Sequence, residues 1–179
     1  MKIIAFAGSN SDTSINKKLV TYAASLFEGS EVEILDLNDY EMPLYKVQRE
    51  QGSGIPQQAQ TLAEKIDDTD LILLSLAENN SNFSAAFKNV FDWLSRVPGR
   101  KAFGGKKVFL MATSPGARGG AGVLSVAQTT FLHSGAEVVD TFSLPVFNES
   151  FDVENNKISH TEKDAELREK IQKLRAVEL

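Results

Sequence analysis

The sequence predicts an α/β fold in a single domain over residues 1–179, in which helices cover both faces of a five-stranded parallel sheet. Nearly continuous apolar runs, such as residues 3–7 and 70–76, are typical of strands buried on both faces. Segments with helical spacing of apolar residues alternate with these runs along the chain. The length of 179 residues is enough to bury one substantial core. Together these observations favour a three-layer sandwich.

Each element follows from a local pattern. The predicted strands cover residues 3–7, 31–37, 70–76, 107–113 and 136–142. The predicted helices begin after the N-cap candidate Ser14, at Pro56, at about Phe83 (ending near Arg96), before Val123 and at Thr161. The fourth helix carries the apolar residues Val123, Leu124, Ala127, Phe131 and Leu132. Residues 38–55 and 147–159 read as irregular segments.

Strand and helix alternate five times, which predicts a parallel sheet with helices on both faces, and one common strand order in such sheets is 2-1-3-4-5. Strands 1, 3 and 4 then lie side by side, and ligands of such sheets bind at the carboxyl ends of the strands. Three loops with unusual composition leave these strands, at residues 8–16, 77–82 and 114–120. We therefore expect all three loops to line one crevice.

The first of these loops has the composition of an anion site. It is rich in small neutral donors and leads directly into a helix, whose first N–H groups lack intrahelical acceptors and carry a positive partial charge. A phosphate monoester would fit there. The alternative is an ordinary strand-to-helix turn whose serines only cap the helix. The fingerprints of a P-loop and of a dinucleotide-binding turn are both absent from the sequence.

Composition narrows the function classes. The 19 basic and 24 acidic residues give a net charge of −5, which argues against nucleic acid or an anionic membrane as a partner. The sequence contains no cysteine and two histidines, so we expect no thiol catalysis and no metal site. No catalytic acid–base pair is evident, and we assign no catalytic residue. Without a leader pattern or a long apolar run, we expect a cytoplasmic protein.

Three motifs occur in these loops and in the helix after the second one: Gly8-Ser9 with Ser14 and Asn16, Glu78-Asn79-Asn80-Ser81 followed by residues 88–96, and Ser114-Pro115-Gly116 with Gly119-Gly120. In this order, over about residues 2–145, they resemble the NADPH-dependent FMN reductase family. The resemblance implies a flavodoxin-like fold, bound FMN, and NADPH or NADH as electron donor. It also implies a small acceptor such as free flavin, a quinone or an azo compound.

The resemblance further implies roles for individual residues. The phosphate of FMN would be held by the first loop, through Ser9, Ser11, Ser14, Ile15 and Asn16. The isoalloxazine and ribityl groups would be approached by the second loop, through Glu78, Asn79, Asn80 and Ser81. The pyrimidine edge would be bordered by the third loop, through Ser114, Pro115, Gly116, Ala117, Arg118 and Gly119. There the N-terminus of the following helix would stabilise the anionic reduced flavin.

Two positions depart from the family pattern. Ser11 stands where an arginine is usual, and Asn79 stands where a tyrosine is usual, in which case Phe83 is the aromatic residue that would approach the flavin. These departures keep two alternatives open: an FMN-binding electron carrier that does not react with nicotinamide, and a flavodoxin-like binding protein without reductase activity. The wide apolar stripe over residues 83–97 indicates either a homodimer contact, with a tetramer also possible, or a thick monomer core.

Overall fold

The computed structural model describes residues 1–176 and contains a five-stranded parallel sheet in the order β2-β1-β3-β6-β7. This order confirms the predicted arrangement 2-1-3-4-5. The strands are β1 (Lys2–Gly8), β2 (Glu31–Leu35), β3 (Leu71–Leu76), β6 (Lys106–Thr113) and β7 (Ala136–Leu144). All six residues of β3 are buried, as its continuous apolar sequence predicts for a central strand.

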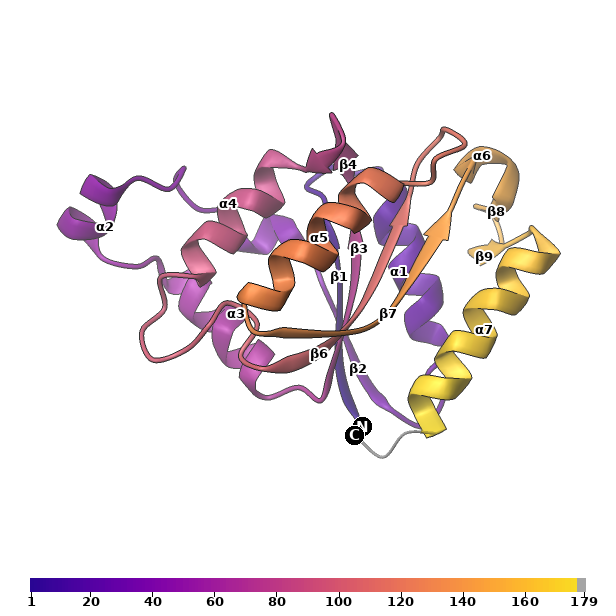
Figure 1. Ribbon diagram of the computed structural model, residues 1–179, viewed down its shortest axis with the longest axis horizontal. Helices are drawn as coiled ribbons and strands as arrows, with labels where there is room; N and C mark the ends of the chain where they lie inside the picture. The colour runs from indigo at the N-terminus through magenta and orange to yellow at the C-terminus, as the bar shows by residue number, and fades with distance from the viewer. Residues whose placement is uncertain (177–179) are drawn as a thin grey trace.

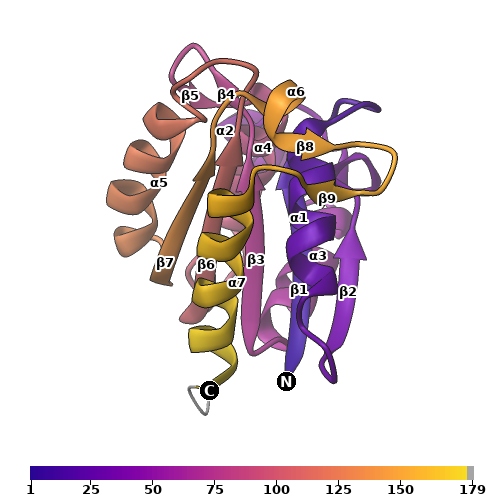
Figure 2. The same cartoon turned by 90° about the vertical axis from the view of Figure 1, so that its right-hand side faces the viewer.

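Helices cover both faces of the sheet, so the molecule has three layers (Figures 1 and 2). One face is covered by α1 (Ile15–Ser25) and α7 (Thr161–Ala176), whose residues Leu167, Ile171 and Leu174 are buried. The other face is covered by α3 (Gln57–Asp67), α4 (Ala85–Leu94) and α5 (Ala121–His133). Each face encloses its own apolar cluster, and together the two clusters form the core.

Five phenylalanines form an aromatic cluster between α4, α5 and the sheet: Phe83, Phe87, Phe91, Phe103 and Phe131. The rings of Phe103 and Phe131 are 4.4 Å apart between centroids, and Phe87 and Phe91 stack at 6.1 Å. Trp93, also on α4, is fully buried and packs edge to face on Tyr45 at 5.1 Å. The apolar side of α4 is therefore covered by other residues of the chain. A thick monomer core explains why the apolar stripe of this helix is wide.

Two details of the helices on this face differ from the sequence pattern. Of the apolar residues noted in α5, Leu132 does not join the core: its side chain is 65% exposed because it lies one position beyond the buried Phe131. The third helix was expected from about Phe83, yet α4 begins at Ala85. Ser84 is its N-cap, and the Ser84 Oγ accepts a hydrogen bond of 3.1 Å from the Phe87 N–H.

The segments expected to be irregular contain short elements. Residues 38–55 overlap a 3-10 turn, η1 (Leu37–Tyr40), and include a helix, α2 (Val47–Ser53). The second loop forms a hairpin of β4 (Glu78–Asn79) and β5 (Asn82–Phe83). Residues 147–159 contain α6 (Phe147–Ser150), β8 (Phe151–Asp152) and β9 (Lys157–Ile158). Elements of two to seven residues are too short to show a sequence period.

The segment that carries α2 extends away from the sheet (Figure 1) but is attached to α4 by polar contacts. The Trp93 Nε1–H donates to the Pro43 carbonyl at 2.8 Å, and the Asn89 amide bonds the main chain of Met42 and Tyr45. No residue of α2 is buried. The helix α2 therefore contributes little to the core, and the residues before it are attached to α4 by these contacts and by the buried Met42.

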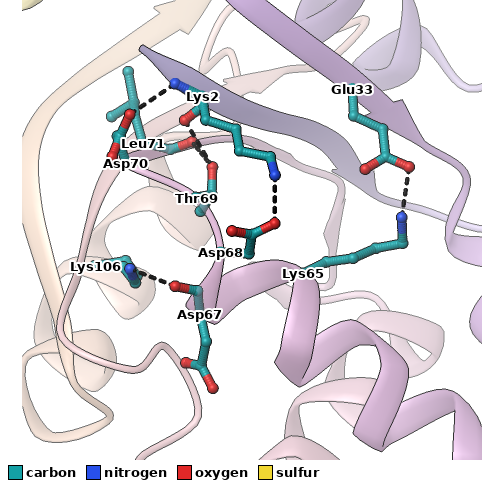
Figure 3. A network of polar contacts seen from close by, with 9 residues as sticks. All are labelled: Lys2, Glu33, Lys65, Asp67, Asp68, Thr69, Asp70, Leu71 and Lys106. Atoms are coloured by element: carbon teal, nitrogen blue, oxygen red, sulfur yellow. Dashed lines mark hydrogen bonds and ion pairs between the residues drawn. The ribbon is translucent and has the colours of Figure 1, made fainter.

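The amino ends of the strands carry a network of internal polar contacts (Figure 3). The Lys2 main-chain N–H donates to Asp70 at 2.7 Å, and the Thr69 hydroxyl donates to the Lys2 carbonyl at 2.9 Å. Lys65 pairs with Glu33 at 2.6 Å. Exposed ion pairs of this kind contribute ~0–1 kcal/mol each to the stability of the fold. We assign this edge of the sheet a structural role.

Among the helices of the described chain, none has the length and apolarity needed to cross a membrane.

We predict that Phe131→Ala will lower the free energy of unfolding by about 3–5 kcal/mol, because it leaves a cavity inside the aromatic cluster. Its neighbour supplies the control: Leu132→Ala removes an exposed side chain and should cost less than ~0.5 kcal/mol. Urea denaturation of both variants checks this. Equal losses would contradict the assignment of Phe131 to the core and Leu132 to the surface.

Candidate functional site

Residues from all three polar loops line one cleft at the carboxyl ends of β1, β3 and β6, with a volume of 240 Å³. Three neighbouring parallel strands end here, so their loops meet at the same edge of the sheet. The lining residues are Ser9, Ser11, Thr13, Ser14, Ile15, Asn16, Ala77, Glu78, Asn79, Thr113, Ser114 and Pro115. The three loops therefore share one crevice, as the strand order predicts.

The side chain of Asn16 ties the first turn of α1 to two strands. Its Oδ1 accepts hydrogen bonds from the Thr113 N–H at 3.0 Å and the Ser75 hydroxyl at 2.8 Å. Its Nδ2 donates to the Thr113 carbonyl at 3.3 Å. All of these groups are buried. The amide of Asn16 thus fixes the position of the helix N-terminus, and its side chain is engaged within the chain.

Ser14 begins α1 as its N-cap. The Ser14 Oγ accepts a hydrogen bond from the Lys17 N–H at 3.1 Å, which leaves its hydroxyl hydrogen available as a donor toward the cleft. In the described chain, the N–H groups of Ile15 and Asn16 have no hydrogen-bond acceptor, as is usual in the first turn of a helix. These donors lie at the positive end of the helix dipole and suit an anion.

The other side-chain donors of the first loop that line the cleft are the hydroxyls of Ser9, Ser11 and Thr13. Ser9 accepts from the Ser11 N–H at 3.3 Å, and the hydroxyls of Ser11 and Thr13 lie 3.5 Å apart. None of the residues that line the cleft in the described chain has a cationic side chain. Nearby Lys17 pairs with Asp36, and this hydrogen bond holds the pKa of the Asp36 carboxyl below its ordinary value. An anion in this cleft would be held by neutral donors.

The second loop forms a tight hairpin whose tip residues, Asn80 and Ser81, have positive φ angles of 52° and 60°. Glu78 and Asn79 line the cleft, whereas Asn80 and Ser81 do not. Phe83 also lies away from the cleft: its ring is 8% exposed and stacks on Phe131 at 5.8 Å. The expectation that Phe83 replaces the missing tyrosine therefore finds no support in its position.

The third loop contributes Ser114 and Pro115 to the cleft, whereas Gly116, Ala117, Arg118 and Gly119 do not line it. The N–H groups of Val146 and Phe147 hold this loop by donating to the carbonyls of Gly116 and Ser114 at 3.1 and 3.0 Å. Val146 reaches this position with a φ of 49°, which is strained for a β-branched residue. A Cβ on Gly119 would lie 2.3 Å from the Ser143 Oγ, so Gly119 packs against the end of β7.

Sequence reasoning missed Ser75, Thr113 and Val146. Ser75 and Thr113 are polar residues near the carboxyl ends of apolar strands, and this signal is visible in the sequence. Nothing in the sequence indicates the left-handed backbone of Val146.

A second hollow of 260 Å³ lies between α4 and residues 37–44, but the amide of Asn89 on its wall is already bonded to that segment.

We predict that Asn16→Ala will lower the free energy of unfolding by about 3 kcal/mol, since it leaves the buried Ser75 hydroxyl and the Thr113 main chain without their partner. Asn10→Ala, in the same loop but exposed, should cost less than ~0.5 kcal/mol. Thermal and urea unfolding of the two variants would test this. A similar loss in both would mean that the Asn16 contacts contribute little.

Comparison with known proteins shows which family and which relatives this chain is similar to. Residues 1–150 match the family model described as NADPH-dependent FMN reductase. A 2-hydroxy-1,4-benzoquinone reductase of Burkholderia sp is 33% identical over 120 residues, which are 66% of this chain and 63% of that protein. An NADPH:quinone oxidoreductase of Arabidopsis thaliana is 28% identical over 171 residues, covering 92% of this chain and 85% of that protein.

A solved structure of the flavoenzyme NAD(P)H:(acceptor) oxidoreductase FerB from Paracoccus denitrificans matches with a TM-score of 0.77 and 23% identity, over 96% of this chain and 93% of that one. That likeness shows the shared flavodoxin-like fold. The matched region spans 63% of the Burkholderia relative and 43% of a quinone reductase from Escherichia coli, so less than two thirds of either. With the family model covering residues 1–150 and the three loop motifs at one cleft, the chain belongs to the NADPH-dependent FMN reductase family.

Proposed function

We propose that this protein is an FMN-dependent oxidoreductase that takes a hydride from NADPH or NADH and passes reducing equivalents to a small acceptor. The observation that carries the proposal is the cleft at the N-terminus of α1, where Ser14, Ile15 and Asn16 offer donors without acceptors. A flavin mononucleotide brings the phosphate monoester that such donors suit.

The donor set fits FMN. The first loop would hold the phosphate through the hydroxyls of Ser9, Ser11, Thr13 and Ser14 and through the free N–H groups of α1. The hairpin and the third loop would border the ring system, with Glu78 and Asn79 on one side and Ser114 and Pro115 on the other. Bound FMN supplies the hydride chemistry, so the protein has to bind and orient two ring systems and needs no acid–base pair of its own.

A quinone is the acceptor class we propose first. The relatives from Burkholderia and Arabidopsis carry names of quinone reductases, and flavin or azo acceptors are the other members of the proposed class. We further propose one domain over residues 1–179 and a cytoplasmic location.

The first experiment is an absorption spectrum of the purified protein with FMN, before and after NADPH is added without oxygen. We expect a flavin band that stays with the protein through gel filtration and bleaches within seconds of NADPH addition. A band that persists with both NADPH and NADH would favour an electron carrier. A protein that retains no FMN would favour the binding protein without reductase activity.

We predict that Ser14→Ala will raise the dissociation constant for FMN about fivefold, because one neutral hydrogen bond contributes ~1 kcal/mol. Ser84→Ala is the matched control, since Ser84 is also a buried helix N-cap but lies outside the cleft. Ser14→Ala should lose ~1 kcal/mol of stability, and Ser84→Ala should lose more, because the Ser84 hydroxyl also donates to the Gly8 carbonyl at 2.8 Å. Fluorescence titration with FMN checks this, and equal affinities in the two variants would place the phosphate elsewhere.

We also propose a homodimer that uses the 83–97 segment. Since the apolar side of α4 is buried, a second copy would meet the outer side of this segment together with the exposed Leu44 and Val47. Light scattering after gel filtration should give twice the monomer mass, and Leu44→Ser with Val47→Ser should shift it toward the monomer. A wild-type monomer at micromolar concentration would contradict this assembly.

A further inference from the structure

Glu78 makes a contact that joins two walls of the cleft. Its Oε2 accepts a hydrogen bond of 2.7 Å from the Val123 N–H, in the first turn of α5. The N-cap of α5 is Gly120, which has no side chain to fill this role. Glu78, 45 residues earlier in the chain, therefore caps α5 from the second loop.

The hairpin also rests on the backbone of α5. A Cβ on Gly122 would lie 2.7 Å from the Glu78 Oε2 and 3.2 Å from the Ser81 Cβ. At the other end of the hairpin, Phe83 stacks on Phe131 of the same helix with an interplanar angle of 7°. Because α5 continues directly from the third loop, these contacts connect the second loop to the third through α5.

The same contact changes the electrostatics of the cleft. A helix N-terminus carries about half a positive charge, and a free one near the flavin would favour its anionic reduced form. Here the carboxylate of Glu78, a cleft-lining residue, lies on that terminus and offsets its positive charge. The N-terminus of α5 is therefore not a free anion site. This corrects the expectation that the N-terminus of the helix after the third loop stabilises the anionic reduced flavin.

On the basis of the proposed function, we propose that Glu78 is a positioning residue of the flavin site. It fixes the hairpin wall to α5, and its charge keeps the reduction potential of the bound flavin below the value that an uncompensated helix terminus would give. The sign follows from charge alone, since a nearby carboxylate disfavours the anionic reduced flavin relative to the neutral oxidised one.

Glu78→Gln separates charge from contact, because the amide oxygen of glutamine can still accept from the Val123 N–H. We expect FMN to bind at least as tightly as in wild type, because a negative charge leaves the cleft, and the midpoint potential to be more positive by about 30 mV, which corresponds to a tenfold change in the ratio of reduced-flavin to oxidised-flavin affinity for a two-electron couple. Glu137→Gln, an exposed carboxylate at the amino end of β7, controls for net charge and should leave the potential unchanged. The potentials are measured against a reference dye without oxygen.

Gly122→Ala tests the positioning role, because its Cβ would displace the Glu78 carboxylate and would also press on the Ser81 Cβ at 3.2 Å, while alanine is a better helix former than glycine. We expect a melting temperature close to that of wild type, because the gain of ~1 kcal/mol from alanine in the helix offsets the loss of the Glu78 cap, together with at least threefold weaker FMN binding. Wild-type affinity in this variant would overturn the positioning role, and equal potentials in Glu78→Gln and Glu137→Gln would overturn the effect of charge. Failure of the wild type to bind FMN would overturn the proposed function itself.

Discussion

Asn16 joins the helix that follows β1 to the carboxyl ends of β3 and β6 through three hydrogen bonds of a single buried amide. The cleft exists where it does because these three elements are held in register at their ends. In a buried environment such a network stabilises only when every member is satisfied, since an unpaired polar group there is costly. The donors of the α1 N-terminus thus acquire a fixed position relative to the other two loops.

The two edges of the sheet have different roles. At the amino ends, charged side chains such as those of Lys65 and Glu33 pair with one another near the surface (Figure 3). At the carboxyl ends, the polar groups belong to loops whose backbone is fixed from outside, by Val146 and Phe147 for the third loop and by α5 for the hairpin. Binding groups that are ordered beforehand do not have to lose that freedom when a ligand arrives.

The sequence allowed the strands of the sheet to be predicted, because strands such as β3 are buried on both faces and read as continuous apolar runs, while their order was taken from the known orders of such sheets. It also located the three loops, since polar residues follow such strands abruptly. The directions in which the side chains of the loops point could not be predicted from the sequence. Whether Phe83 faces the cleft or the core depends on a hairpin of two-residue strands, and Glu78 is fixed by a helix 45 residues away. Contacts between distant segments leave no local period in the sequence.

The absence of cationic side chains among the residues lining the described cleft has a kinetic consequence. The field of a dipole falls with distance faster than that of a charge, so the N-terminus of α1 acts on a phosphate only once it is close. At longer range, a dianionic phosphate approaches a chain of net charge −5 and meets repulsion, which added salt screens. The encounter with such a ligand should therefore become faster as ionic strength rises, the opposite of the behaviour of sites that steer their ligands with lysine and arginine.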